Sequence, residues 1–262
     1  MSGVGVLNRP HVGIVLGAGS ARGIAHLGVL QVFEEEGLPI DVVVGCSAGA
    51  IFGALYATGV DLYITEKLIT TYPVIKQLTD LVVPKNGFVK GERILELIRL
   101  LTKNMTFEET PKTLAIVATD LEHGKQVVFT EGKIAPAVRA SISIPGVFTP
   151  YRYQGMVLVD GAVKERLPVR AAKQCGADCV IGVNVKNGRE VKINNILDVM
   201  MQSVEIMEEE IFNRTALEAD ILIEPEVGHI GSFKFELAGE AVRLGREAAL
   251  KSIPEIKRAL CL

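Results

Sequence analysis

A serine lies between two glycines near the start of the chain, in residues 45–49, which read GCSAG. The apolar run DVVVG leads into this motif and the small-residue pattern AIFGALYATG follows it, so it lies between an expected strand and an expected helix. In that setting a sharp turn exposes the serine hydroxyl, and Gly45 and Gly49 avoid the Cβ clashes of so tight a bend. The pattern predicts Ser47 as a nucleophile, with the N–H of Ala48 and the helix N-terminus near any oxyanion. A chance match in a glycine-rich chain is the alternative.

A serine hydroxyl needs a neighbouring group that takes its proton, so the sequence must also supply a base. The chain has four histidines, at positions 11, 26, 123 and 229. In the chain order serine, aspartate, histidine, a triad of Ser47, Asp160 and His229 would match the α/β-hydrolase arrangement. A solvated loop residue is the other interpretation of His229, because it has no local partner in its polar loop.

An aspartate offers a second candidate base. Asp160 closes the apolar run MVLVD and is followed by Gly161 and Ala162. Open α/β sheets place their sites at the carboxyl ends of the strands, which is where this carboxylate is expected. An aspartate that only forms a turn before glycine is the alternative.

A glycine-rich turn follows the first apolar run of the chain. Such a turn can direct several backbone N–H groups at an anion, since glycine permits unusual dihedral angles and the next helix adds positive potential. A dinucleotide site is disfavoured, because Arg22 takes the place of the third glycine and Asp41 opens the second strand instead of closing it. A Walker A loop is excluded by the missing Gly-Lys-Ser/Thr, and a structural turn remains open. The residues of the turn are Gly17, Ala18, Gly19, Ser20, Ala21, Arg22 and Gly23.

The elements that position these residues alternate along the chain. Continuous Val/Ile runs are typical of strands buried on both faces, and amphipathic stretches lie between them. Strands are expected at 11–17, 41–45, 113–119, 126–130, 156–160, 179–185 and 220–225. Helices are expected near 24–36, 48–58, 61–71, 91–102, 133–140, 167–175, 194–217 and 236–260. The order predicts an α/β fold in three layers, α/β/α, whose mixed, mostly parallel sheet includes a hairpin of the third and fourth strands.

Domain organisation follows from length and from the absence of a linker. The chain has 262 residues, 48% of them hydrophobic, and no repeat or Pro/Ser-rich segment divides it, so residues 1–262 are expected to form one domain. Residues 60–110 contain a short LVVP run as their single strand-like segment, so they are expected to form a helical cap over the sheet.

Composition limits the classes of partner. The net charge is −3 and no block of Lys and Arg is present, so nucleic acid is disfavoured as a partner. The four cysteines lack zinc-site spacing, and buried free thiols are expected instead of a metal site. Mean hydropathy is +0.32, and residues 42–60 carry no charge, but the glycines in this run favour a strand, turn and helix over a membrane span. No signal peptide is seen at the start, which favours a cytoplasmic protein.

Two helical patterns raise the question of a lipid surface. The stretch 235–260 mixes acidic and basic residues, which favours a helix packed on the domain over one that lies on a membrane. The apolar stretch 194–207, which contains Met200, Met201 and Met207, is expected in the core or in a subunit contact. Peripheral contact with the inner membrane face stays open, as does oligomerisation.

Taken together, the three motifs resemble the patatin-like phospholipases, in particular their compact bacterial members. The resemblance extends to RASISIPGVFTP at 139–150 and to ADILIEPEVGHIGSF at 219–233, and so to nearly the whole chain. Two departures stand out, because the glycine turn is one residue longer than the short family form and Ala162 replaces a frequent glycine. The motifs that carry the resemblance are Gly17-x-Gly19-x-x-Arg22-Gly23, Gly45-x-Ser47-x-Gly49 and Asp160-Gly161-Ala162.

The resemblance implies an α/β/α sandwich without a cofactor, in which Ser47 attacks an acyl ester and Asp160 takes its proton without a histidine. It implies that backbone N–H groups of residues 17–23 form the oxyanion hole, and the longer turn leaves open which of them do so. We therefore expect a lipid acyl hydrolase that acts on a phospholipid or another acyl ester. An acyltransferase and a non-catalytic regulatory protein are the alternatives. Arg22 is expected either to brace the turn or to meet a lipid head group.

Overall fold

The structure is a computed structural model that describes residues 9–71, 89–185, 193, 196–215 and 218–262. Five parallel strands form its centre, and three of them are buried over their whole length. The order across the sheet is β5-β6-β3-β2-β1-β7-β8, and β4 pairs with β3 as well. The parallel strands are β1 (Val12–Leu16), β2 (Val42–Cys46), β3 (Thr113–Asp120), β7 (Cys179–Val183) and β8 (Ile221–Ile223).

The remaining strands run antiparallel, which makes the sheet mixed. The hairpin of β3 and β4 (Lys125–Phe129) confirms the predicted pairing. β6 (Met156–Asp160) pairs with β3 and with β5 (Tyr151–Tyr153). β5 was not predicted, since three residues with a central arginine show no apolar run. The LVVP run lies outside the described residues.

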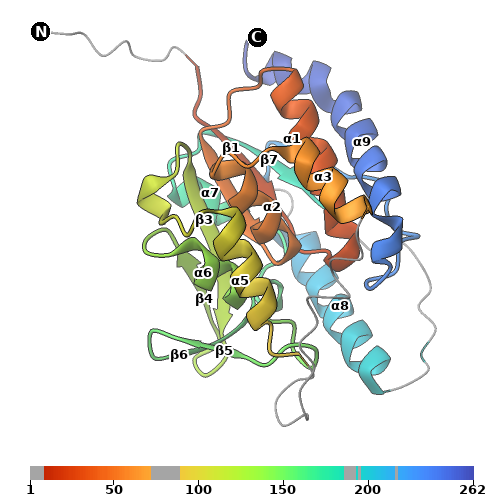
Figure 1. The fold of residues 1–262 in the computed structure, drawn as a ribbon. Coiled ribbons are helices and arrows are strands. Elements are labelled where there is room, and N and C mark those ends of the chain that lie inside the picture. The colour runs from red at the N-terminus through yellow and green to blue at the C-terminus, as the bar shows by residue number, and fades with distance from the viewer. Residues whose placement is uncertain (1–8, 72–88, 186–192, 194–195, 216–217) are drawn as a thin grey trace, which may run out of the picture.

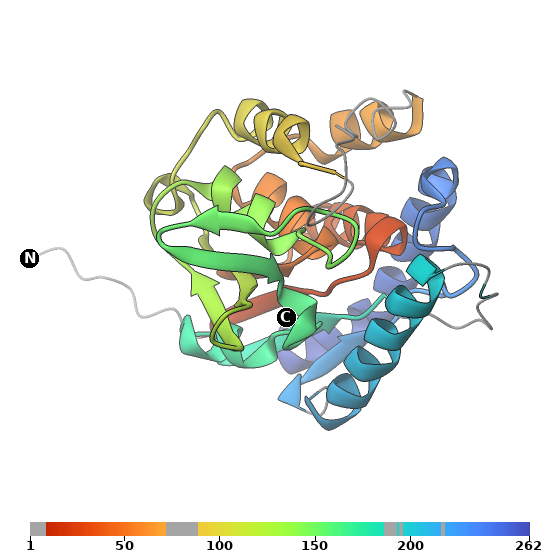
Figure 2. The ribbon, with the colours of Figure 1, turned by 90° about the horizontal axis from the view of Figure 1, so that it is seen from below.

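Helices cover both faces of the sheet, as Figures 1 and 2 show. On one face, Ile14, Leu16 and Val43 belong to a core shared with α1, α2, α6 and α9. On the other face, Val15 and Val42 pack with residues of α7. The alternation along each strand follows from the period of two, so these runs bury both of their faces. The helices are α1 (Ala25–Glu35), α2 (Ala48–Ala57), α6 (Ile134–Ser141), α7 (Val169–Gln174) and α9 (Ala238–Ala259).

Helices also lie in the region 60–110, where a cap was predicted. α3 (Leu62–Thr71) and α5 (Glu92–Leu101) lie on the same side of the sheet as α2, in orange and yellow in Figure 2. Residues 72–88 lie outside the described part, so the boundaries of a cap stay a prediction. On the opposite side, α8 (Ile196–Thr215) lies below the sheet in the same view.

The register of β3 brings two distant strand ends together. One edge of β3 pairs with β4 over Ile116–Asp120. β2 pairs with β3 as far as Val117, and β6 pairs with β3 from Ala118 onward, so both overlap the β4 pairing and must share the other edge. Because β2 runs parallel and β6 antiparallel to β3, their carboxyl ends meet head to head. Cys46 is the last residue of β2 and Asp160 the last of β6.

Three further expectations concern membrane, thiol and metal chemistry. Among the described helices, none has both the length and the apolar character that crossing a bilayer requires. All four cysteines are free thiols, but Cys261 is exposed just after the end of α9, so burial was wrong for that residue. In the described part of the chain, no group of three or more His, Cys, Asp or Glu side chains could hold a metal ion.

Candidate active site

Ser47 occupies the turn between β2 and α2 in a strained backbone conformation. Its φ of 54° and ψ of −119° lie where residues other than glycine are uncommon. Such strain persists only where the surrounding structure enforces it. A Cβ at Gly49 would run into the carbonyl oxygen of Leu16, so the close approach of α2 to β1 requires glycine there. The side chain of Ser47 is 4% exposed.

A second serine holds this turn in place. The N–H of Ser47 donates to the hydroxyl oxygen of Ser141 at 2.8 Å, and that hydroxyl donates to the carbonyl of Val117 at 2.6 Å. Ser141 is fully buried at the end of α6. It therefore ties the turn to β3 with one hydroxyl and satisfies two buried backbone groups. The sequence analysis assigned no role to this residue, and a serine in the apolar stretch RASIS was the available signal.

Asp160 is buried at the end of β6, where the head-to-head strands bring it beside the serine turn. Its N–H donates to the carbonyl of Ser143 at 3.0 Å, and its Oδ1 accepts from the N–H of Ala162 at 2.9 Å. Burial raises the pKa of Asp160 to about 6, while hydrogen bonding from the Ser47 hydroxyl and from the Ala162 N–H opposes the rise. Most molecules therefore carry an ionised Asp160 at pH 7, with a carboxylate basic enough to take a proton.

A buried thiol lies on the other side of the carboxylate. The Sγ of Cys46 is 4.0 Å from Oδ1 of Asp160. Burial raises the pKa of the Cys46 thiol, and the charge of Asp160 raises it further, so this group stays protonated. Cys46 is therefore a neutral neighbour of Asp160, without the thiolate that a nucleophilic cysteine needs.

The glycine turn contributes backbone N–H groups, several of which already have partners. Ala18 N–H donates to the carbonyl of Arg166 at 2.9 Å, and Gly17 N–H donates to that of Val183 at 3.1 Å. Ala21 and Arg22 also donate within the protein. Within the described residues, the N–H groups of Gly19 and Ser20 have no such partner, and both residues line a cavity with Ser47. Gly23 packs directly against Ala48, where a Cβ would clash with the alanine methyl.

Arg22 braces this turn against the rest of the protein. Its guanidinium donates to the carbonyl of Ile230 at 3.3 Å, to the hydroxyl of Ser232 at 3.4 Å and to Glu205 at 3.0 Å. These contacts fit the bracing role that the sequence left open beside a head-group contact.

The structure assembles no triad around Ser47 from the histidines. His229 Nε2 lies 2.8 Å from Glu240 of α9, and His229 does not line either cavity at the serine. His26 is fully buried with its Nε2 2.7 Å from the carbonyl of Gly17, and burial lowers its pKa to about 4. His26 therefore supports the glycine turn as a neutral ring. His123 pairs with Asp120 at 2.7 Å.

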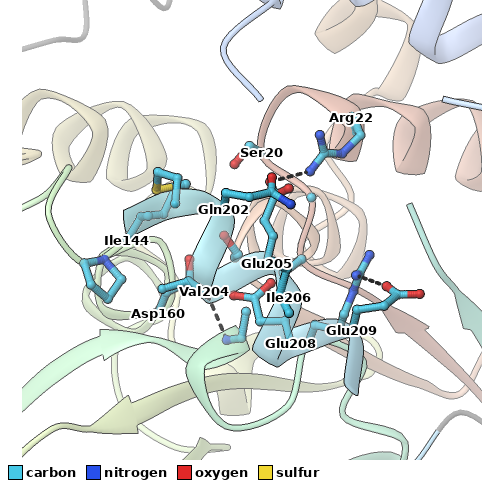
Figure 3. Close-up of a pocket in the computed structure, with 17 residues that line it drawn as sticks. Ser20, Arg22, Ile144, Asp160, Gln202, Val204, Glu205, Ile206, Glu208 and Glu209 are labelled. Atoms are coloured by element: carbon cyan, nitrogen blue, oxygen red, sulfur yellow. Dashed lines mark hydrogen bonds and ion pairs between the residues drawn. The ribbon is translucent and has the colours of Figure 1, made fainter. Parts of the chain in front are cut away.

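Two cavities meet at Ser47, and they differ in chemistry. The first has a volume of about 380 Å³ and contains charged side chains beside Ser47 and Asp160 (Figure 3). The second has a volume of about 240 Å³ and a lining that is almost wholly apolar, from α2, α3, α5 and the segment 142–148. Along α2 this second cavity is lined by Ala48, Ile51, Phe52 and Leu55, which share one helix face.

The charged cavity is closed on one side by α8, which sequence reasoning did not connect with the site. Glu205 of α8 reaches Arg22, and Glu209 reaches Arg166 at 2.9 Å (Figure 3). Between them, burial raises the pKa of Glu208 to about 8, and the negative charge of Asp160 adds to the rise, while Arg166 opposes it. Glu208 is thus mostly protonated at neutral pH.

The fold and the cavities define a class of protein: an α/β/α sandwich with its candidate site where the carboxyl ends of β2 and β6 meet. The chain belongs to the patatin-like phospholipase family, whose model matches residues 14–173. It is 37% identical over 182 residues to an NTE family protein of Mycobacterium bovis, covering 69% of this chain and 50% of the relative. A lysophospholipase of Eremothecium gossypii is 32% identical over 185 residues, covering 69% and 12%. The chain thus spans half the length of these relatives or less.

Among solved structures, VipD from Legionella pneumophila shares the fold. The two superpose with a TM-score of 0.68 at 17% sequence identity, over 94% of this chain and 67% of VipD. At that identity the likeness concerns the fold, which agrees with the predicted three-layer α/β/α sandwich and mixed sheet.

Proposed function

We propose that this protein is a lipid acyl hydrolase that cleaves carboxylic esters through an acyl-serine intermediate. One observation carries the proposal: Ser47 and Asp160 lie where a charged cavity meets an apolar one. An acyl ester needs both environments, because its chain is apolar and its ester and head group are polar. Membership of the patatin-like phospholipase family supports the same class of reaction.

The reaction begins with the Ser47 hydroxyl. Its Oγ bonds to the ester carbonyl carbon while its proton passes to the carboxylate of Asp160. The protonated Asp160 then gives this proton to the leaving alcohol as the C–O bond breaks, which leaves an acyl-serine. A water molecule attacks the acyl-serine, Asp160 takes a proton from it, and the proton returns to Ser47 as the fatty acid leaves. A base with a pKa near 6 suits both directions of transfer.

The oxyanion that forms at the attacked carbonyl needs hydrogen-bond donors. We assign the N–H groups of Gly19 and Ser20 to this role, together with that of Ala48 at the start of α2, since none of the three donates to a partner in the described part of the chain. The first N–H groups of a helix have no partner within it, so Ala48 is available by position. Losing one such donor typically lowers kcat by about a hundredfold or more. Gly17, Ala18, Ala21 and Arg22 then hold the shape of the turn.

The acyl chain would occupy the apolar cavity, with α3 and α5 as the cap. A cavity of about 240 Å³ holds roughly eight groups of the size of a water molecule, which is near the size of a methylene. The head group would point toward the charged cavity. A cytoplasmic location with contact to the inner membrane face is part of the proposal, and so is a phospholipid or similar acyl ester as substrate.

A covalent probe tests the nucleophile. A fluorophosphonate should label the purified protein, and Ser47→Ala should remove the label, whereas the exposed Ser203→Ala on α8 serves as a matched control and should keep it. Equal labelling of wild type and Ser47→Ala would refute the assignment. For the base, Asp160→Asn should abolish turnover of a dissolved nitrophenyl ester, and His229→Ala should leave turnover within about twofold, since His229 pairs with Glu240 away from the cavities.

A further inference from the structure

Helix α8 directs acidic side chains toward the protein and apolar side chains toward the solvent. Its side toward the protein carries the polar residues Gln202, Glu205, Glu208 and Glu209, which line the charged cavity together with Met201 and Val204. Of the side chains described on this helix, Phe212 alone is buried. Between Ile196 and Met207 the helix exposes apolar side chains away from the cavity, with exposed fractions from 44% to 74% at Ile196, Val199, Met200 and Met207, and Ile206 at the cavity rim is 60% exposed. A surface helix usually turns its apolar side toward the core and its charges toward water, so this arrangement is reversed.

The five apolar side chains form one stripe, which we call the α8 stripe. Ile196 lies three and four residues before Val199 and Met200, and these two lie seven residues before Ile206 and Met207, which places all five on a single face of the helix. At these exposures the stripe presents on the order of 400 to 500 Å² of apolar surface, a size typical of an interaction site. Two ion pairs, Arg22–Glu205 and Arg166–Glu209, fix the helix and therefore the direction of the stripe.

The stripe reaches the charged cavity, and α8 is also tied to a segment that lines the apolar one. Ile206 belongs to the stripe and also lines the charged cavity at Ser47. Phe233, which is 52% exposed, lines the apolar cavity, and its neighbour Ser232 donates to Glu205 of α8 at 3.1 Å. A partner that covers the stripe therefore reaches the charged cavity at Ser47, where the apolar cavity also begins.

We propose that the α8 stripe docks the protein on a zwitterionic lipid surface and so presents the two cavity mouths to the lipid. This inference rests on the proposed lipid substrate, which must enter from such a surface. A second copy of the chain is disfavoured, because a stable protein interface buries roughly 800 Å² on each partner, well above the stripe. An anionic membrane is disfavoured as well, because Arg214, the one basic residue of α8, already pairs with Glu210 at 2.7 Å.

Flotation with phosphatidylcholine vesicles tests the surface. The wild-type protein should float, and the triple variant Val199→Ser/Met200→Ser/Met207→Ser should show an apparent partition coefficient lower by about tenfold or more, because binding scales with buried apolar area. A matched control, Leu121→Ser/Leu250→Ser/Leu262→Ser, removes three equally exposed apolar side chains elsewhere and should float like the wild type. Circular dichroism of each variant confirms folding, and none of the six positions lines either cavity at Ser47.

Several outcomes would overturn the docking surface. They are a wild type that does not float, an α8 triple variant that floats as well as the wild type, and flotation that requires anionic lipid. Sedimentation velocity that shows a wild-type dimer converted to a monomer by the α8 substitutions would assign the stripe to a second copy. Hydrolysis of a dissolved nitrophenyl ester should be equal in all three proteins. If no protein hydrolyses it while flotation still depends on the stripe, the hydrolase proposal fails and the docking surface stands.

Discussion

Replacing Asp160 by asparagine should remove activity and at the same time stabilise the fold. The carboxylate is ionised at neutral pH in a buried position, where the charged form is disfavoured. Asparagine has nearly the same shape, and its side-chain oxygen can still accept the N–H of Ala162. The substitution therefore removes the buried charge without removing the hydrogen bond. Turnover should fall by at least about a hundredfold, because the base is lost.

The size of the stabilisation follows from the pKa. Burial raises the pKa of Asp160 from 3.8 to about 6, so the charged form costs the folded protein about 3 kcal/mol at pH 7. Because the folded pKa is raised, this cost is absent below pH 3.8 and complete above pH 6. At pH 5 it is about half as large, since the folded protein then holds a mostly protonated Asp160. The new amide N–H₂ needs partners of its own, so we expect a net gain of about 1 to 3 kcal/mol at pH 7.

Urea unfolding followed by circular dichroism at pH 7 and at pH 5 measures both numbers. The Asp160→Asn protein should have the higher free energy of unfolding at pH 7, and the difference should shrink at pH 5. Asp160→Ala removes the same charge but leaves the N–H of Ala162 without a partner, so its gain should be smaller. An asparagine variant less stable than the wild type at pH 7, or a difference that is equal at both pH values, would refute the reasoning.

Other perturbations have equally direct outcomes. The kcat/KM for a dissolved ester should be about tenfold lower at pH 5 than at pH 7, because Asp160 must lose a proton near pH 6, and a flat acid limb would contradict its role as base. Wild-type kcat/KM should also decline above pH 8 as Glu208 ionises in the cavity that contains Ser47 and Asp160, and Glu208→Gln should lack that decline while its acid limb stays unchanged. Ser141→Ala should lower the free energy of unfolding by about 1 to 3 kcal/mol, since it strands two buried backbone groups, and an unchanged urea midpoint would count against this. Leu55→Trp should lower kcat/KM for an octanoyl ester about tenfold while an acetyl ester is hardly affected, and equal losses for both would move the acyl chain out of the apolar cavity.

The sheet could be predicted from the sequence where its strands are buried on both faces. The Val/Ile runs of β1 and β2 need no partner to be recognised, and the hairpin of β3 and β4 is local in the chain. β5 could not be predicted, because its three residues form a strand by pairing with β6 and not through an apolar pattern of their own. For α8, the apolar pattern correctly predicted a helix. Of the two placements left open for its apolar side chains, the core is wrong for Met200 and Met207, and a subunit contact stays a prediction. The spacing of apolar residues shows that they share one face of a helix, but it does not show whether that face contacts the rest of the protein or the solvent.

The candidate site also has parts that the local sequence predicts and parts that depend on distant segments of the chain. The motifs pointed to Ser47 and Asp160 as the candidate pair, since each lies at the end of a recognisable run. The N–H groups at the serine could not be chosen from the glycine turn, because the partners of Gly17 and Ala18 come from distant segments. Ser141 was missed for a similar reason, since its two partners are 94 and 24 residues away in the chain. The ion pair of Arg166 and Glu209 could not be predicted either, because the two residues are far apart in the sequence and come together on folding.

The head-to-head meeting of β2 and β6 also governs when the site can exist during synthesis. Ser47 leaves the ribosome long before Asp160, by on the order of ten seconds at roughly 5–20 residues per second. Until β6 pairs with the far end of β3, the serine has no carboxylate beside it, and no shorter segment of the chain holds both strands. If the proposed function holds, an unfinished chain would therefore lack the Ser47–Asp160 pair and its ester turnover. Recovery of ester turnover during refolding accordingly reports long-range closure of the sheet and not the formation of local structure.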